Sequence, residues 1–279
     1  MDKKLPVIPD EREEDLQNLH LADRADLIVF LAGNQFMLAG ELMQAFQKQY
    51  PEVENIFYET LPPGLELKQI LAGGAMFRGQ VIDVCPDVYT SVSLKSMQLL
   101  EEKDLIFNDY FVYAHNRLSL MVARGNPKKI VSVSDLARED VRVSQPDPEV
   151  EDIGHYILNM YLKAGGENLV LTIMQDKLSR GLTRLTTVHH RETPERIMNG
   201  QADVGPVWYT EILSAQQKGL PLEGVEVGED LDQHEEVNYY VCRLKKGLHQ
   251  ENGKKIVRFL KSGQAQDIYK KFGFVPEEF

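Results

Sequence analysis

The sequence contains few cysteines and no long apolar run. Only Cys85 and Cys242 occur in 279 residues, and no CxxC pair is present. This count fits neither a disulfide framework nor a cysteine zinc site. Both cysteines lie in apolar, β-like stretches, which favours buried free thiols, with one long-range disulfide as the alternative. No stretch of about 18 apolar residues exists, so we expect no direct insertion into a membrane.

Basic residues are also in the minority. The chain has 31 Lys and Arg against 43 Asp and Glu, a formal net charge of −12. This balance argues against a nucleic acid or an anionic membrane as the main partner. It does not exclude a small anionic ligand, because a site a few Å across responds to local dipoles and charges. The 43% of hydrophobic residues are enough for an ordinary core.

The beginning of the chain lacks the apolar segment of a secretory signal. "MDKKLPVIPDEREEDLQNLHLADRAD" has no apolar h-region and is not an intact signal peptide. Two interpretations stay open: a cytosolic protein, or a sequence that starts after a removed signal. Because the stretch is polar and rich in acids, we expect residues 1–23 to form a flexible arm.

Catalytic and metal-binding motifs are missing too. The sequence has no G-x-S-x-G, no H-E-x-x-H and no P-loop. We therefore predict no enzyme, no catalytic residue and no cofactor. An acid/base pair of His190 with Asp147 or Glu192 is the enzymatic alternative. A metal site at His189 and His190 is disfavoured, because neighbouring residues on a strand point to opposite faces.

A strand–loop–helix pattern occurs three times in the first part of the chain. A buried strand over 27–31 precedes an amphipathic helix that Pro51 ends. "NIFYETLPPG" and "QVIDVCPDVYTSVS" lead into two further helices. This alternation predicts an α/β fold with a mostly parallel sheet flanked by helices. In such sheets ligands bind beyond the carboxyl ends of the strands.

Polar side chains follow each of these three strands. Asn34 and Gln35 lie in the loop "AGNQ", Thr60 in "ETLPPG" and Ser91 in "YTSVS". We predict that they line one sheet edge and contact a ligand. Helix capping is the alternative role for the first two and for Ser91.

The strand–helix pattern restarts after "FVYAHNRLSLMVARGNPKKI" and supplies a second group of candidates. Asp147 lies between two prolines, and its alternative role is a rigid surface turn. His155 and Tyr156 begin the following helix, where one of them can face a ligand. Packing is the alternative for both.

The stretch "VHHRETPERIMNGQADVGPVWYTE" is dense in groups that bind small molecules. Thr193 before Pro194 predicts a helix start with Thr193 as the cap, which places the preceding residues in a strand and loop. His190, Arg191 and Glu192 are therefore ligand candidates. The planar guanidinium of arginine matches carboxylates and oxyanions bidentately, and a solvated ion pair with a nearby glutamate is its alternative role.

Trp208 and Tyr209 close the same stretch. They are predicted to lie on a strand and therefore point to opposite faces. We expect one of them to pack in the core and the other to reach the ligand.

The order of these landmarks resembles a known family. "NRLSLMVARGNPKKIVSVSDLAREDVRVSQPDP", "PERIMNGQADVGPVWYTEI" and the closing "VRFLKSGQAQDIYKKFGF" resemble the type II periplasmic solute-binding proteins of ABC importers. "AGGAMFRGQVIDVCPDVYTSVSLKSMQLL" is similar to that family's glycine-rich turn, strand and serine loop. The resemblance covers about residues 25–279, and the molybdate/tungstate-binding branch is the most similar.

The resemblance implies two α/β lobes with a ligand cleft between them that closes by hinge bending. Lobe I would comprise 24–112 and 239–279, and lobe II 113–238. It also implies a periplasmic or cell-surface receptor that binds a small anion, partners an ABC permease and acts as a monomer. A cytosolic ligand sensor or carrier on the same fold is the alternative, ahead of a metal-binding protein or an enzyme.

The chain departs from the molybdate branch at several ligand positions. That branch usually has small hydroxyl residues in the first two loops, where this chain has Asn34, Gln35 and Thr60. In the tungstate-type proteins a Pro-Asp-Pro carboxylate, here Asp147, and a second acid complete the metal's coordination. The second position carries Val207 or Trp208 instead. The expected ligand is therefore either an oxyanion such as molybdate or tungstate, or a small carboxylate.

Overall fold

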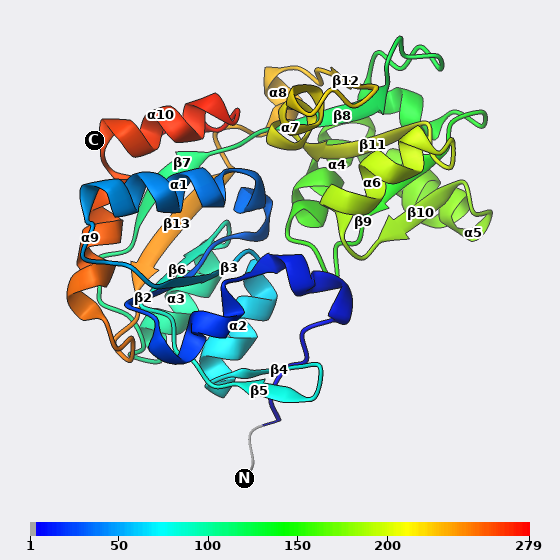
Figure 1. Ribbon diagram of the computed structural model, residues 1–279. Helices are drawn as coiled ribbons and strands as arrows, with labels where there is room; N and C mark the ends of the chain where they lie inside the picture. The colour runs from blue at the N-terminus through cyan, green and yellow to red at the C-terminus, as the bar shows by residue number, and fades with distance from the viewer. Residues whose placement is uncertain (1–3) are drawn as a thin grey trace. The chain divides into compact units, whose positions relative to one another are not determined.

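The computed structural model describes residues 4–279, apart from the side chain of His189. The chain forms two compact units (Figure 1). Unit 1 runs through His115 and resumes over Asn238–Lys271 and Val275–Phe279, and unit 2 comprises Asn116–Val237 and Phe272–Phe274. Among the described residues, no helix has the length and apolarity needed to cross a membrane.

Unit 1 is built on a seven-stranded sheet with the order β1-β3-β2-β6-β13-β7-β14. The strands are β1 (Leu16–Gln17), β2 (Leu27–Phe30), β3 (Ile56–Glu59), β6 (Val88–Ser91), β7 (Phe111–His115), β13 (Asn238–Arg243) and β14 (Val275–Pro276). β2 pairs in parallel with β3 and β6, whereas the remaining pairings are antiparallel. The prediction of a mostly parallel sheet is wrong here. β7 leaves the unit and β13 returns to it, so these two neighbours run in opposite directions.

Helices cover both faces of this sheet. They are α1 (Phe36–Gln49), α2 (Pro63–Ala72), α3 (Leu94–Glu102), α9 (Gln250–Leu260) and α10 (Gly263–Lys271), with the short 3-10 turn η3 (Gly33–Gln35) before α1. Ile28 and Phe30 point into one core together with residues of α2 and α3. On the other face α1 packs against α9 and α10, with Phe46 in edge contact with Phe259. The hairpin β4 (Ala75–Phe77) and β5 (Gln80–Ile82) follows α2.

The N-terminal segment is packed against unit 1, so the expectation of a flexible arm is wrong for its described part. It forms two 3-10 helices, η1 (Asp10–Asp15) and η2 (Leu19–Arg24), on either side of β1. Ile8 and Leu16 are buried in the core beside α2. β1 extends the sheet by pairing with β3. Two apolar anchors and a short strand ladder therefore hold a segment whose composition is mostly polar.

Unit 2 contains a five-stranded sheet with the order β10-β9-β11-β8-β12. The strands are β8 (Leu118–Ala123), β9 (Val143–Pro146), β10 (Thr183–Thr186), β11 (Val204–Trp208) and β12 (Leu222–Val225). β9 is parallel to β10 and β11, and β8 is antiparallel to β11 and β12. Like the first sheet, it is mixed.

The helical elements of unit 2 are η4 (Val133–Ala137), α4 (Ile153–Leu171), the π-helical turn η5 (Thr172–Asp176), α5 (Lys177–Ser179), α6 (His189–Met198), α7 (Tyr209–Gln217) and α8 (Glu229–Asp232). The pair Gly165–Gly166 lies within α4, although adjacent glycines often end a helix. Gly166 adopts φ 67° and ψ −166°, so the helix kinks there and continues. α6 and α7 cover the core formed by β8, β11 and β12.

Cys85 and Cys242 are free thiols, so the alternative of a disulfide between them does not hold. Cys242 is buried in the core that contains Ile28 and Phe30, and Cys85 packs at its border. Burial raises the pKa of the Cys85 thiol to about 11. Both groups therefore remain protonated and unreactive at neutral pH.

Candidate functional site

In unit 1 the predicted loops meet at one edge of the sheet. Because β2 is parallel to both β3 and β6, the residues that follow these strands lie at the same edge. Gly33 shows how closely the first two loops approach. A Cβ atom there would lie 3.1 Å from the carbonyl oxygens of Thr60 and Leu61. A side chain there would be tightly placed against these oxygens, so glycine favours the close approach that brings Asn34 and Thr60 into one region.

Gln35 belongs to the core beneath this edge. Its Nε2 donates to Tyr113 Oη at 2.5 Å and to Thr90 Oγ1 at 3.3 Å, and its Oε1 accepts from Tyr269 Oη at 2.9 Å. The side chain is fully buried. Its amide is thus used within unit 1, where it fixes the first loop to β6, β7 and α10. With both its oxygen and its nitrogen engaged there, Gln35 is a weaker ligand candidate than Asn34 or Thr60.

The side chains of Asn34, Ser91 and Thr60 differ in the hydrogen bonds that they already form within unit 1. Asn34 Nδ2 donates to Tyr239 Oη, and Ser91 Oγ accepts the Ser93 N–H at 3.1 Å. The buried Thr60 Oγ1 has no hydrogen-bond partner in the described part of the chain. Thr60 therefore carries the hydroxyl of this edge that is most in need of a partner.

A buried carboxyl group lies next to Thr60. Glu59 ends β3 with an exposed fraction of 0%, and its Oε2 accepts from Gln69 Nε2 at 2.7 Å. Burial raises the pKa of Glu59 to about 8 against the opposing effect of the Gln69 hydrogen bond, and the nearby charge of Asp15 adds to the rise. Sequence analysis missed this group, although an acid directly after the apolar run "NIFY" was a visible signal.

Near the start of α4 in unit 2, one candidate residue forms a turn and another makes an aromatic contact. Asp147 Oδ1 accepts the Glu149 N–H at 2.9 Å, which is the rigid-turn role considered as its alternative. His155 is exposed in the first turn of α4. The rings of Tyr156 and Trp208 meet edge to face with centroids 5.6 Å apart. The structure therefore joins two candidates from distant parts of the sequence.

The start of α4 is also acidic. Burial raises the pKa of Asp152 to about 6, the charge of Glu151 adds to the rise and His155 opposes it. The buried Asp152 Oδ2 has no hydrogen-bond partner among the described residues. Carboxylates of this kind disfavour an anion at the same position.

Glu192 caps the helix that contains it. Its Oε2 accepts the N–H groups of Thr187 and Val188, both at 2.6 Å, and its Oε1 accepts from Arg196 Nη2 at 2.7 Å. The carboxylate therefore binds the two N–H groups immediately before α6 and a guanidinium at once. The prediction that the helix starts at Thr193 is wrong, because this cap lies one turn earlier.

The residues around Thr193 are helical as a consequence. α6 begins at His189, so His189 and His190 lie on a helix instead of a strand. His190 is buried and Arg191 is half-buried. Thr193 Oγ1 forms a hydrogen bond of 2.9 Å with Ser144 Oγ, which ties α6 to β9. Pro194 lies inside α6, where it has no N–H to donate to the carbonyl oxygen four residues earlier.

Trp208 and Tyr209 lie at the junction of β11 and α7. Trp208 is buried at the end of the strand, whereas Tyr209 is half-buried in the first turn of the helix. The guanidinium carbon of Arg117 lies 3.8 Å from the centroid of the Tyr209 ring, and Arg117 also forms an ion pair with Glu226. Sequence analysis missed Arg117, since a single arginine after a strand carries no distinctive pattern.

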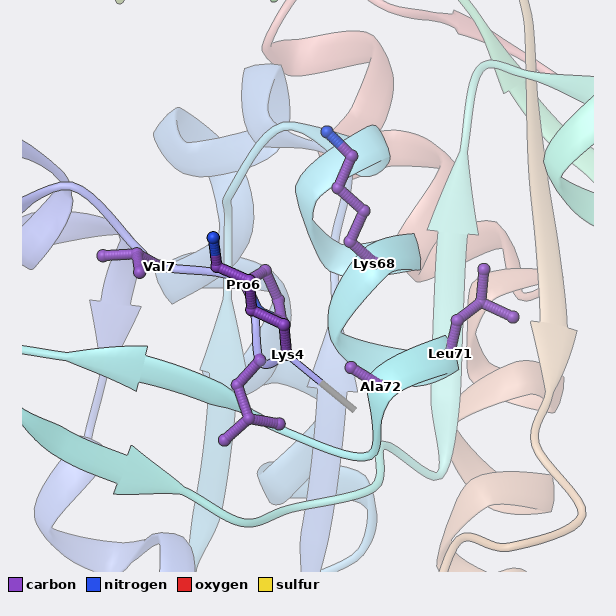
Figure 2. A pocket seen from close by; sticks show the side chains of 7 residues that line it. Lys4, Pro6, Val7, Lys68, Leu71 and Ala72 are labelled. Atoms are coloured by element: carbon purple, nitrogen blue, oxygen red, sulfur yellow. The ribbon is translucent and has the colours of Figure 1, made fainter. Parts of the chain in front are cut away.

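A separate open groove of about 520 Å³ lies on unit 1 (Figure 2). Its lining consists of Lys4, Leu5, Pro6, Val7, Lys68, Leu71 and Ala72. These residues come from the N-terminal segment and from α2, and none of them is a predicted site residue. Among the described side chains, which do not include that of His189, no group of three or more His, Cys, Asp or Glu is placed to hold a metal ion.

Comparison with known proteins identifies the class. Residues 27–275 match the family of bacterial extracellular solute-binding proteins, and the chain belongs to this family. The family is one of solute-binding proteins, not of enzymes. The resemblance noted in the sequence is therefore confirmed.

Individual relatives are distant. YvgL of Bacillus subtilis (strain 168), named as an ABC transporter substrate-binding lipoprotein, is 23% identical over 189 residues, which cover 68% of this chain and 66% of YvgL, slightly less than two thirds of its length. The periplasmic molybdate-binding protein of Azotobacter vinelandii superposes with a TM-score of 0.71 at 19% identity, covering 90% of this chain and all of that one. The sulfate-binding protein SubI of Mycobacterium tuberculosis gives 0.70 at 16% identity, over 89% and 85%. These two structures confirm the predicted α/β fold class and show the fold alone.

Proposed function

We propose that the protein is the extracytoplasmic receptor of an ABC importer, and that it binds a small oxyanion or carboxylate between its two units, which act as closing lobes. It would act as a monomer and pass its ligand to a membrane permease. The observation that carries this proposal is the convergence of Asn34, Thr60 and Ser91 at the carboxyl edge of β2, β3 and β6. Membership of the solute-binding family supports it.

The chemistry of the unit 1 edge favours a ligand that accepts hydrogen bonds. Thr60 offers a buried hydroxyl without an internal partner, and Asn34 and Ser91 add an amide and a second hydroxyl. Such donors stabilise an anion in a closed site without a cationic side chain. Glu59 is compatible with this role because its raised pKa keeps it mostly uncharged at neutral pH.

Unit 2 would supply the positive charge. Arg191 is half-buried near the start of α6, and Arg117 lies against Tyr209. Either guanidinium can bind a carboxylate or an oxyanion with two parallel hydrogen bonds. Tyr156 and Trp208 would form an apolar side of the site. His190 is a further candidate here, whereas Asp147, His155 and Glu192 are weaker ones, since an acidic turn, an exposed ring and an engaged carboxylate suit an anion poorly.

Thermal unfolding across a ligand panel tests the proposal. The panel contains molybdate, tungstate, sulfate, phosphate and small carboxylates. A ligand present at about 100 times its Kd stabilises the folded state by about 2.7 kcal/mol, which gives a clear rise in Tm. Thr60→Ala and Arg191→Gln should each abolish most of that rise, whereas Arg184→Gln, a change of an exposed arginine in the same unit, should keep it. A panel without any stabilising anion would contradict the proposal.

A further inference from the structure

A cluster of ionisable side chains is buried where the N-terminal segment crosses unit 1. Asp15 of this segment, Glu59 of β3 and Glu66 of α2 have exposed fractions of 0%. Gln69 of α2 and Arg12 of η1 are buried with them. The cluster thus holds three carboxyl groups and one guanidinium, and Arg12 Nη1 lies 3.4 Å from Asp15 Oδ2. Three ionised carboxylates would leave a net negative charge in the interior.

The surroundings of Glu59 favour the protonated, uncharged form of its carboxyl group. One oxygen, Oε2, accepts from Gln69 Nε2. The other, Oε1, is buried and has no hydrogen-bond partner in residues 4–279. A carboxylate oxygen in this position is costly unless a proton neutralises the group. The raised pKa of Glu59 agrees with this geometry.

Glu59 lies directly beneath the segment that covers it. Leu16 of β1 is paired with Glu59 in the strand register, and the Thr60 N–H donates to the Asp15 carbonyl oxygen at 2.9 Å. The same few residues therefore bind the N-terminal segment and bury the carboxyl. A change in the charge of Glu59 is therefore expected to affect the docking of the N-terminal segment on β3 most directly.

We propose that Glu59 is a proton-dependent latch, which holds residues 8–24 on β3 while its carboxyl is protonated and weakens their docking when the proton is lost to solvent. The ionisable groups around it are Asp15 and Arg12 from the N-terminal segment and Glu66 from α2. The neighbouring strands contribute the apolar Leu16 and Phe30. The latch concerns the attachment of the segment and does not rest on the proposed ligand.

Two phenols lie on other strands of the same sheet. Burial raises the pKa of Tyr113 in β7 well above the usual range, and the nearby charge of Glu66 adds to the rise. Tyr89 of β6 is buried, and its hydroxyl donates to the Pro63 carbonyl oxygen at 2.8 Å. The Tyr113 phenol therefore stays neutral where Glu59 titrates.

Hydrogen exchange of the backbone amides tests the latch. In the full-length protein we expect the protection of residues 8–24, corrected for intrinsic exchange, to fall by about tenfold or more between about pH 6 and about pH 9. Glu59→Gln keeps the shape of the side chain without its titration and should hold protection constant over this range. Glu54→Gln, which removes an exposed carboxyl before the same strand, should behave like the unchanged protein.

Infrared spectroscopy of the unchanged protein provides a second measurement that does not depend on the folding of any variant. A carbonyl band of a protonated carboxylic acid should be present at neutral pH and should disappear with the same midpoint as the loss of protection. The latch is refuted if protection of residues 8–24 does not change with pH, if it falls equally in Glu59→Gln, or if no protonated carboxyl is seen at neutral pH.

Discussion

The two units bury an ionisable side chain in opposite ways. In unit 2 the ammonium of Lys177, with an exposed fraction of 0%, donates to three carbonyl oxygens, those of Leu136, Arg138 and Val141, at 2.7, 2.6 and 2.6 Å. In unit 1 the Glu59 carboxyl has one hydrogen bond, from Gln69. An ammonium has three donors, so Lys177 is satisfied while charged. Only one of the two Glu59 oxygens accepts a hydrogen bond from a described residue, so its protonated, neutral form is favoured.

The same burial therefore leaves a base with three acceptors charged at neutral pH and an acid with one donor uncharged. Burial lowers the pKa of Lys177 to about 8 and raises that of Glu59 to about 8. At neutral pH Lys177 is still mostly charged and serves as a structural link between η4, α5 and the turn before β9. Glu59 is mostly uncharged under the same conditions and can respond to pH.

The largest effect is expected from Lys177→Met. The change leaves three carbonyl oxygens without their donor, which should reduce the free energy of unfolding by about 3–5 kcal/mol. Urea unfolding measures it. Lys163→Met is the matched control, because Lys163 pairs with Glu236 at the surface and should contribute about 1 kcal/mol or less. If the two substitutions reduced the free energy of unfolding equally, the buried ammonium of Lys177 would contribute no more than the exposed one of Lys163.

Glu59→Gln should have the next largest effect, and its sign depends on pH. The folded pKa of Glu59, about 8, lies above its ordinary value of 4.5, so the folded state holds its proton more tightly than the unfolded state. Stability is therefore lost as pH rises from about 4.5 to about 8, by on the order of 2–4 kcal/mol. Glu59→Gln should remove this slope and be the more stable protein at about pH 8. A wild-type slope that persists in the variant would show that other groups cause it.

Glu192→Ala should have an intermediate effect, because Glu192 is a charged group satisfied at the surface. Loss of its hydrogen bonds to the Thr187 and Val188 N–H groups should cost about 1–2 kcal/mol and loosen the first turn of α6. Chemical denaturation gives the magnitude, and hydrogen exchange locates it. Protection that is unchanged at residues 187–192 would show that the cap does not stabilise the helix.

The smallest effect is expected at the ion pair of Arg180 and Glu139. Both side chains are exposed, and their closest atoms are 2.7 Å apart. Solvent screening offsets most of such an attraction. Arg180→Gln should leave the urea midpoint unchanged within error. A measurable loss of stability would mean that an exposed ion pair in unit 2 stabilises the fold much as the buried hydrogen bonds of Lys177 do. This result would contradict the expected difference between the two.

Local patterns in the sequence predicted the core of unit 1 well. The run Leu27–Phe30 is a buried strand and Phe36–Gln49 the helix after it, because alternation of strands and one-sided helices depends on short-range periodicity. The N-terminal segment was mispredicted, since its polar composition hides two apolar anchors, Ile8 and Leu16. The start of α6 was mispredicted because the threonine–proline pair resembles a cap, whereas Glu192 supplies the cap from within the helix.

The candidate site could be predicted only as positions along the chain. The loops after β2, β3 and β6 follow from topology, so Asn34, Thr60 and Ser91 were found as neighbours. The distribution of their hydrogen bonds could not be predicted, because Gln35 is engaged by tyrosines that lie 78 and 234 residues away in the sequence. The stacking of Arg117 on Tyr209 depends on tertiary packing in the same way.

Titration calorimetry of the unchanged protein with molybdate, sulfate, phosphate and a small carboxylate tests whether the protein is an anion receptor. We expect at least one of these anions to bind at one site per chain, with a Kd on the order of micromolar or tighter, about −8 kcal/mol. Binding should weaken by tenfold or more in Thr60→Ala. The absence of heat and of saturable binding for every anion, in a protein that is folded by circular dichroism, would show that it is not a receptor for these anions.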